Sequence, residues 1–248
     1  MRLISSLLTV AAIFPITPAY SQDGDYKNAF VEANILSIFY HELGHAIIDL
    51  MNVPIFGQEE DAADVMSVLL IDWLYNEEDA QAIAYDSAFG YLNDPNQTEE
   101  VPYWDLHGPD EQRFFNHICV FFGANPEERE DLADDLGLPD ERAETCPDEY
   151  DQANNSWGAI FDEMENHTES VSMVFKAGRA LDEHIAVQLL EDEVRHMNED
   201  LKLPQKVTVE VVDCGEANAF YDPESVTITF CSEFVGHLEE IYDVLFPR

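Results

Sequence analysis

The sequence predicts a mainly helical α+β domain with a small antiparallel sheet contributed largely by the C-terminal part of the chain. Most of the chain has apolar positions that recur at helical spacing, whereas segments rich in β-branched residues are few and lie after residue 170. No repeat of fixed period, low-complexity segment or linker divides the chain. We therefore expect a single domain over residues 22–248.

The first helical pattern covers residues 27–50 and contains no proline. It ends at Asn52-Val53-Pro54, and a short loop through Gly57 leads into the next helical pattern. Because their connection is short, we expect these two helices to pack side by side. The helical patterns after the first cover residues 59–75, 77–91, 110–122, 127–136, 148–166, 181–198 and 233–245.

The strand signals come late in the chain. Residues 170–176 alternate weakly between apolar and polar, and residues 206–212 and 225–230 are rich in β-branched side chains. We expect the last two segments to form a hairpin. Its connection is too long for a two-residue turn and would be held at its base by Cys214 and Cys231.

Residues 1–21 have the layout of a secretory signal peptide, with Arg2, an apolar stretch over residues 3–16, and cleavage expected after Ser21. An uncleaved anchor is the alternative. No later segment is long and apolar enough to span a membrane, so we expect a secreted or periplasmic protein of bacterial type with no stable membrane insertion after cleavage.

The four cysteines lie in the expected mature part, and none forms the closely spaced pairs of a zinc knuckle. Export to an oxidising compartment favours two disulfides. Four cysteines permit three pairings, and closeness in sequence favours Cys119 with Cys146 and Cys214 with Cys231.

The chain is strongly acidic, with 11 Lys and Arg against 52 Asp and Glu and a formal net charge of −41. Such a surface repels nucleic acid and anionic membranes, which are therefore not expected as partners. Two interpretations remain open: attraction of cationic substrates or calcium, and a solvated acidic surface suited to salty surroundings.

The first helical pattern contains the run His41-Glu42-Leu43-Gly44-His45. Residues four apart project from one face of a helix, so His41 and His45 can present two imidazole nitrogens to one metal ion. Glu42 lies beside that position, where its carboxylate can take a proton from a water activated by the metal. This pattern predicts half of a catalytic zinc site together with its general base.

A catalytic zinc ion usually has three protein ligands, and the next helix offers the third. Glu60 and Asp64 are four residues apart and share a face that the short turn can fold back onto the first helix. We expect Glu60 to ligate the metal, Asp64 to accept the outer N–H of a ligand histidine, and Glu59 and Asp61 to face elsewhere. The alternative is an acidic helix N-terminus favoured by the helix dipole.

Hydrolysis of a carbonyl compound also needs a donor for the developing oxyanion. The candidates are His107, Tyr221 and His237. We favour His107, because Asp105 lies two residues before it and could orient its ring, and because the surrounding loop suits the rim of an active site.

These runs resemble the gluzincin metallopeptidases, the class that contains thermolysin and neprilysin. The resemblance implies that His41, His45 and Glu60 bind one Zn²⁺ per chain, that Glu42 is the general base, and that Asp64 orients a ligand. The spacing from His45 to Glu60 is shorter than in thermolysin. The whole mature chain is also similar to a bacterial putative-metallopeptidase family of unknown function, through the runs HELGHAIIDLMNVPIFGQEEDAAD, DLHGPDEQRF and CGEANAFYDPESVTITFC.

The run Asn218-Ala219-Phe220-Tyr221 resembles the Asn-Ala-Tyr/Phe segment of neprilysin relatives, which lies along their active-site cleft and binds the substrate backbone. That resemblance implies substrate-binding roles for Asn218, Ala219 and Tyr221, although the segment precedes the zinc helix in those enzymes and follows it here. An exposed strand edge can bind an extended peptide through main-chain hydrogen bonds. The alternative is a turn stabilised by Asn, Asp and Pro.

Taken together, the sequence predicts a zinc-dependent metallopeptidase that acts on a peptide or protein substrate. The alternative from another functional class is a non-catalytic, zinc-stabilised periplasmic binding or interaction protein that keeps the peptidase fold. Amide hydrolysis on a non-peptide substrate is a third possibility. Glu42 distinguishes the first two, since a purely structural zinc site does not need a carboxylate beside the metal.

Overall fold

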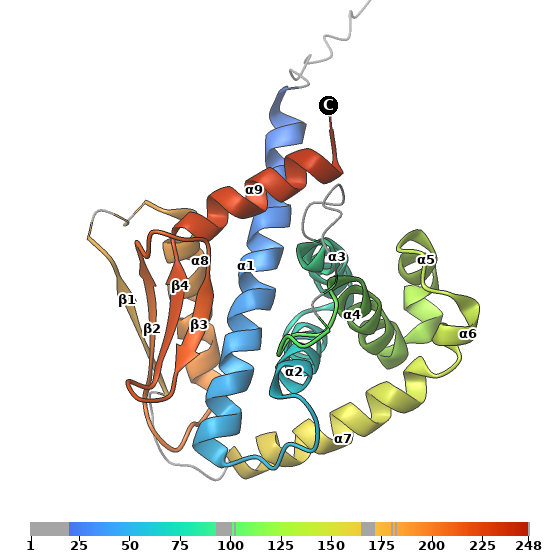
Figure 1. Ribbon diagram of the computed structural model, residues 1–248, viewed down its shortest axis with the longest axis horizontal. Coiled ribbons are helices and arrows are strands. Elements are labelled where there is room, and N and C mark those ends of the chain that lie inside the picture. The colour runs from blue at the N-terminus through green and yellow to red at the C-terminus, as the bar shows by residue number, and fades with distance from the viewer. Residues whose placement is uncertain are drawn as a thin grey trace, which may run out of the picture.

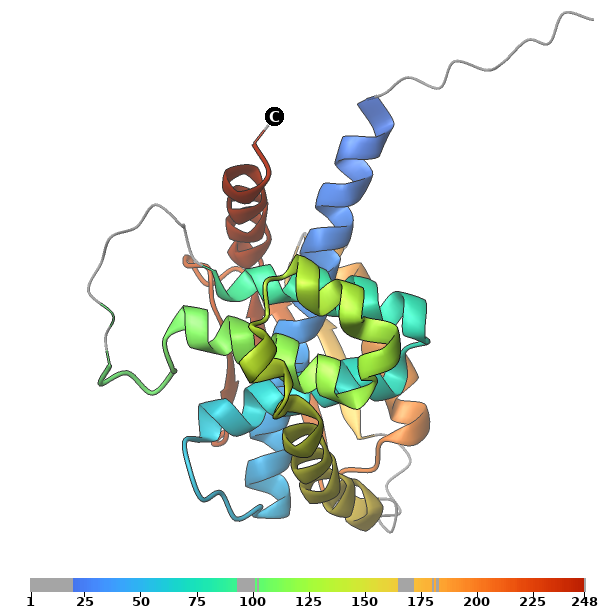
Figure 2. The ribbon, with the colours of Figure 1, turned by 90° about the vertical axis from the view of Figure 1, so that its right-hand side faces the viewer.

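Helix α1 (Tyr20–Met51) runs through the middle of the molecule and separates a four-stranded sheet from a group of helices (Figure 1). Viewed from the helical side, α3 to α7 lie in front of α1 (Figure 2). The computed structural model describes residues 20–92, 101, 103–164, 172–179, 181 and 183–247. Helix α1 therefore has neighbours on several sides, and the histidine motif lies on the most enclosed element of the fold.

Most observed elements overlap the predicted helical and strand segments, and the exceptions are α6 and β3, which were not predicted. The helices after α1 are α2 (Glu59–Leu74), α3 (Glu77–Ala88), the short 3-10 helix η1 (Phe89–Tyr91), α4 (Asp110–Ala124), α5 (Pro126–Asp135), α6 (Asp140–Ala143), α7 (Cys146–Met164), α8 (Ile185–Asp200) and α9 (Glu233–Leu245). The strands are β1 (Met173–Ala177), β2 (Val207–Val212), β3 (Ala219–Asp222) and β4 (Thr227–Cys231). The prediction of a mainly helical α+β fold is confirmed.

Helix α1 is buried on most of its circumference. Phe30, Ile35, Phe39, Leu43 and Ile47 are each at most 1% exposed. They are buried because α2 and α3 pack on one side of α1, while β3, β4, α8 and α9 pack on the others. A helix that is apolar on several faces belongs in a core, and each such side chain contributes roughly 1.5–3 kcal/mol on burial. The motif helix is therefore held rigidly.

Helices α1 and α2 form an antiparallel pair, as the short connection predicted. Ser37 of α1 faces Ser67 of α2, with 3.0 Å between their hydroxyl oxygens. Further along, Gly44 lies so close to α2 that a Cβ at this position would be 3.1 Å from the Cα of Ala63. Glycine is needed at position 44 for this close approach, which brings the first turn of α2 onto the two histidines.

The predicted hairpin of residues 206–212 and 225–230 is wrong. Strands β2 and β4 are adjacent but parallel, and the sheet order β1-β2-β4-β3 contains one antiparallel pair, β3 with β4. The sheet is therefore mixed rather than antiparallel. The long connection after β2 contains a further strand, β3. A turn in which Val226 has a φ of 51° then joins β3 to β4. The true hairpin consists of β3 and β4.

Both predicted disulfides are present. Cys119 pairs with Cys146 and joins α4 to α7, and Cys214 pairs with Cys231 and joins the start of the β2–β3 connection to the end of β4. Disulfides are typical of proteins that reach an oxidising compartment. The predicted signal peptide, residues 1–21, lies almost entirely outside the described residues, which begin at Tyr20, the first residue of α1. None of the helices in the described part of the chain is long and apolar enough to cross a membrane.

At the other end of α2, the buried guanidinium of Arg129 joins three helices. It donates to the carboxylates of Asp72 at 2.7 Å and of Glu77 at 2.8 Å, and it lies 3.7 Å from the ring centroid of Phe121. The hydroxyl of Tyr150 donates to the second carboxylate oxygen of Asp72 at 2.7 Å. The C-terminal part of α2 is thereby attached to α3, α5 and α7.

Replacing Gly44 by alanine should lower the free energy of unfolding by about 1–3 kcal/mol, because the new methyl group meets the backbone of Ala63. Urea denaturation measures this change. The matched control is Gly158→Ala within α7, where an added Cβ meets nothing within 4 Å. Helix propensity predicts that this control stabilises the protein by up to about 1 kcal/mol. Equal effects of the two substitutions would contradict close packing at Gly44.

Candidate metal centre

Side chains from α1 and α2 converge on one point. The Nε2 atoms of His41 and His45 lie 3.2 Å apart, and Oε2 of Glu60 lies 3.2 Å from each of them. These are the three residues that the sequence predicted as metal ligands, and they form a cluster of potential ligand atoms within the described part of the chain. The antiparallel packing of α1 and α2 brings them together.

The three atoms fit a zinc ion. Ligand atoms about 2.0–2.1 Å from a tetrahedral metal lie about 3.3 Å from one another, close to the spacing observed here. The Nδ1 atoms of His41 and His45 each face a carboxylate and therefore carry a proton. In the neutral rings, the lone pairs of the two Nε2 atoms then point toward each other and toward a carboxylate oxygen of Glu60. Three electron-pair donors in such a position need a cation between them.

Each histidine is oriented through its other ring nitrogen. The Nδ1–H of His41 donates to Oδ1 of Asp64 at 2.8 Å, as the sequence predicted. The Nδ1–H of His45 donates to Oε1 of Glu59 at 2.8 Å. The prediction that Glu59 faces elsewhere is therefore wrong. In an antiparallel helix pair, a residue further along the first helix lies beside a residue nearer the start of the second. His45 therefore contacts Glu59, and His41 contacts Asp64.

Arg113 of α4, which the sequence analysis did not single out, holds Asp64. Its Nε and Nη2 atoms donate to the two carboxylate oxygens of Asp64, each at 2.8 Å. Its guanidinium carbon lies 4.7 Å from the ring centroid of Tyr91. Bidentate pairing fixes the carboxylate plane and so the ring of His41. The sequence feature that could have identified Arg113 is the small number of basic residues. In a chain with 11 Lys and Arg, a half-buried arginine needs a specific partner.

The Glu42 carboxylate is buried beside the ligands, at 8% exposure. It accepts a hydrogen bond from the backbone N–H of Tyr221 in β3. Burial raises the pKa of Glu42, although the nearby rings of His41 and His45 act in the opposite direction. A carboxylate with a raised pKa exchanges protons more readily near neutral pH than an ordinary surface glutamate.

His107 reaches the same cluster from the loop before α4. Its Nε2–H donates to Oε2 of Glu60 at 3.0 Å, and its side chain is 46% exposed. Asp105 lies where the sequence analysis expected it: its Oδ1 is 3.5 Å from Nδ1 of His107 and accepts the backbone N–H of His107 at 3.1 Å. The ring is thus aimed at the ligands while its other side faces solvent.

Strand β3 is the edge strand of the sheet and lies against α1. Its register with β4 turns the backbone of Ala219 and Tyr221 away from β4, toward the open edge. The backbone carbonyl of Asn218 accepts from Cys231, and the side-chain oxygen of Asn218 accepts the N–H of Ala219 at 2.9 Å. The segment is therefore an edge strand and not only a turn, and the N–H groups of Ala219 and Tyr221 on its outer side are bound by Asn218 and Glu42.

The other two oxyanion candidates have different surroundings. The hydroxyl of Tyr221 donates to Oδ2 of Asp49 at 2.8 Å, so this side chain is paired with α1. His237 lies on α9 beside Phe234, with their ring centroids 5.8 Å apart. Of the three candidates, His107 is the one whose ring contacts a ligand residue.

The charges of the cluster determine its titration. Burial lowers the pKa of His41, but hydrogen bonds with Asp64 and Glu60 outweigh it and raise the pKa to about 9. Burial raises the pKa of Asp64, but the hydrogen bonds from Arg113 and His41 lower it to about 2. In the metal-free protein, protons on the histidines therefore take the place of a cation, and a metal ion has to displace them.

Comparison with known families gives one result. A family model, DUF4344, with the description "Putative metallopeptidase", matches residues 9–161 and 176–244. The matched regions include the histidine motif, the acidic start of α2, the His107 loop and the β3–β4 hairpin. Searches of curated proteins and of solved structures found no significant match.

Replacing Asp64 by asparagine should lower zinc affinity about 10–100-fold, because the Nδ1–H of His41 loses its charged acceptor. Competition with a chromophoric chelator measures the affinity. Asp61→Asn is the matched control, since Asp61 lies in the same turn of α2 but is exposed and outside the ligand cluster. An equal loss in both variants would indicate a general charge effect instead.

In the metal-free protein, the free energy of unfolding should fall as pH rises from about 6.5 to about 9. The pKa of His41 is raised in the folded state, so the protonated ring stabilises the fold below its unfolded pKa, and this contribution is lost as pH passes the folded value. Urea denaturation in the presence of a chelator tests this. Asp64→Asn should flatten the slope, and a constant stability across this range in the parent protein would contradict the assignment.

Proposed function

Because the chain belongs to the DUF4344 family, whose model carries the description "Putative metallopeptidase", we propose that it is a zinc-dependent metallopeptidase with Glu42 as general base. The observation that carries the proposal is the position of the Glu42 carboxylate. It is buried next to the converging atoms of His41, His45 and Glu60 and is held by the backbone of β3. A structural metal site does not require such a group.

His41, His45 and Glu60 would hold the ion. When bound, zinc supplies a Lewis acid that polarises a carbonyl and makes a water molecule more acidic. Asp64 and Glu59 keep the two imidazoles in the tautomer that leaves Nε2 free to coordinate, and Arg113 keeps Asp64 ionised and oriented. Three protein ligands leave a coordination position for water and substrate, which is the pattern of catalytic sites.

Glu42 accepts the proton of the attacking water and delivers it to the leaving amine. Its raised pKa suits both steps, since the group must be ionised first and protonated afterwards. The hydrogen bond from the Tyr221 backbone fixes the carboxylate relative to the substrate-binding edge. Proton transfer therefore takes place between the ligand cluster and β3.

His107 is the proposed donor to the developing oxyanion. Its Nε2–H points at Glu60, so a substrate carbonyl oxygen next to the metal would lie within reach of the same N–H. Asp105 lies at the far side of the ring, and the hydrogen bond with Glu60 raises the pKa of His107, which favours the charged, donating form. The partial exposure of His107 leaves space for the substrate on that side.

The proposed substrate is a peptide or protein segment in an extended conformation. On the side away from β4, strand β3 presents the backbone carbonyls of Ala219 and Tyr221. The N–H groups of the same two residues are bound by Asn218 and Glu42, so an extended peptide would pair with this edge by donating to the carbonyls. Asn218, at the start of the strand, would contribute its side-chain amide. A peptide paired with β3 would pass directly over the ligand cluster.

Glu42→Gln should reduce peptide hydrolysis by about 1,000-fold or more while the protein retains one zinc ion, because the general base is lost and the ligands remain. Cleavage of a diverse peptide library, followed by mass spectrometry, and metal analysis of the same samples measure both properties. Glu32→Gln, an exposed position on the same helix, is the matched control and should retain full activity.

The possible results separate the candidate functions. Stoichiometric zinc with no peptide cleavage by the parent protein would favour a zinc-stabilised binding protein. Equal activity of Glu42→Gln and the parent would overturn the role of Glu42. Folded parent protein without affinity for zinc would overturn the metal centre itself.

A further inference from the structure

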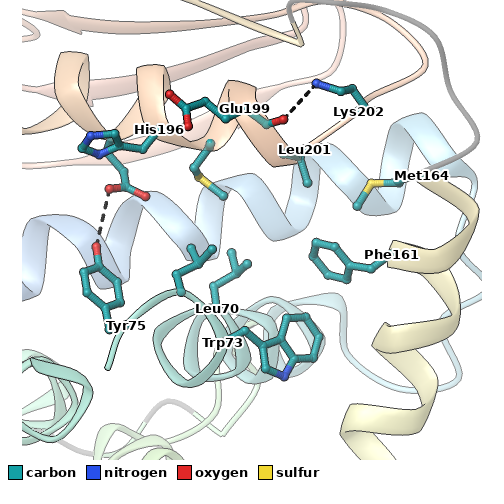
Figure 3. Close-up of a pocket in the computed structure, with 12 residues that line it drawn as sticks. Leu70, Trp73, Tyr75, Phe161, Met164, His196, Glu199, Leu201 and Lys202 are labelled. Carbon is teal, nitrogen blue, oxygen red and sulfur yellow. Dashed lines mark hydrogen bonds between the residues drawn. The ribbon is translucent and has the colours of Figure 1, made fainter. Parts of the chain in front are cut away.

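Apart from the metal centre, a cavity lies between the C-terminal ends of α2, α7 and α8, and Figure 3 shows the side chains that line it. Its volume is about 370 Å³, which is within the range of small-molecule sites. None of its lining residues belongs to the metal centre. Tyr40 and His41 are consecutive on α1, so their side chains project about 100° apart, toward the cavity and the metal centre respectively.

One end of the cavity is apolar and aromatic. The rings of Trp73 and Phe161 meet edge to face, with centroids 4.9 Å apart, and Met164 lies beside them in Figure 3. Buried Leu70 and Leu201 complete this end. These side chains come from α2, α7 and the residue that follows α8, so the wall depends on the tertiary fold and not on one helix face.

The other end contains the carboxylate of Glu193. Its Oε1 accepts the hydroxyl of the fully buried Tyr40 at 2.7 Å, its Oε2 lies 3.5 Å from the hydroxyl of Tyr75, and the two hydroxyls are 2.8 Å apart. Burial raises the pKa of Glu193, because the ionised carboxylate has lost much of its hydration. Such a group gains from a cation placed against it.

The two basic side chains at the cavity do not occupy that position. The ammonium of Lys202 donates to the backbone carbonyls of Asn198 at 3.0 Å and Glu199 at 3.3 Å. His196 is exposed on α8, and none of the hydrogen bonds or ion pairs found in the described part of the chain joins it to Glu193. Glu193 therefore has hydroxyl partners and no paired cation among the described residues.

We propose that this cavity binds a small amphipathic amine, with its ammonium group at Glu193 and its apolar body against Trp73 and Phe161. The net charge of −41 raises the local concentration of cations and opposes anionic ligands. The site is separate from the metal centre, so the proposal does not depend on peptidase activity.

Three ligands with the same apolar body test the proposal on the zinc-loaded full chain: phenethylamine, phenethyl alcohol and hydrocinnamate. Isothermal titration calorimetry should show saturable binding of the amine, at least about tenfold tighter than that of the alcohol, and no binding of the carboxylate. Equal affinities for amine and alcohol, or no saturable binding of the amine, would overturn the proposed amine site.

Variants locate the site. Glu193→Gln keeps an acceptor for Tyr40 and should lower amine affinity to the level of the alcohol, whereas Glu191→Gln, exposed on the same helix, should leave it unchanged. Leu74→Trp places a larger side chain at the partly exposed rim and should weaken the binding of amine and alcohol alike. Glu42→Gln should have no effect. Amine binding that is unchanged in Glu193→Gln, or lost equally in Glu191→Gln or Glu42→Gln, would contradict the site.

Discussion

The close antiparallel packing of α1 and α2 at Gly44 is the constraint on which the rest of the structure depends. A side chain at this position would push the two backbones apart, since its Cβ would already be 3.1 Å from Ala63. The approach brings Glu60 within 3.2 Å of both histidine nitrogens. Ligands on two helices can bind one ion only if the helix axes are this close. Gly44, the fourth residue of the motif, therefore contributes to metal binding without touching the metal.

Charge is distributed unevenly between the surface and the centre of this protein. The chain carries 52 acidic side chains and 11 Lys and Arg, yet Arg113 and Arg129 are both directed inward, each against carboxylates of α2. A buried arginine fixes the plane of its partner through two parallel hydrogen bonds, which a solvated lysine does not do. Two of the few cations thus hold carboxylates of α2 in place.

Periodicity predicted the helices well, because most of them are amphipathic or buried over several turns. Spacing also predicted His41, His45, Glu60 and Asp64 as one group, since residues four apart share a helix face whatever the tertiary fold. Glu59 was missed because that argument treats one helix at a time, whereas the contact with His45 depends on the antiparallel register of two.

Strand pairing was the weaker prediction. Strand propensity identifies the segments but carries no information on their order, so β2 and β4 were paired as a hairpin although β3 lies between them in sequence and outside them in space. Arg113 was missed for a related reason. Its partner is 49 residues away, and no local pattern encodes that distance.

Helix α2 is attached at its two ends by different chemistry. Its first turn supplies Glu59 and Glu60 to the histidines, while Asp72 near its last turn is bonded to Arg129 and Tyr150. Only the first attachment involves a metal ligand. A bound ion would therefore act on the first turn of α2, while the contacts of Asp72 at the other end do not depend on it, so metal binding is a local event at one end of the helix. A chain built in this way can complete its fold before a metal ion binds.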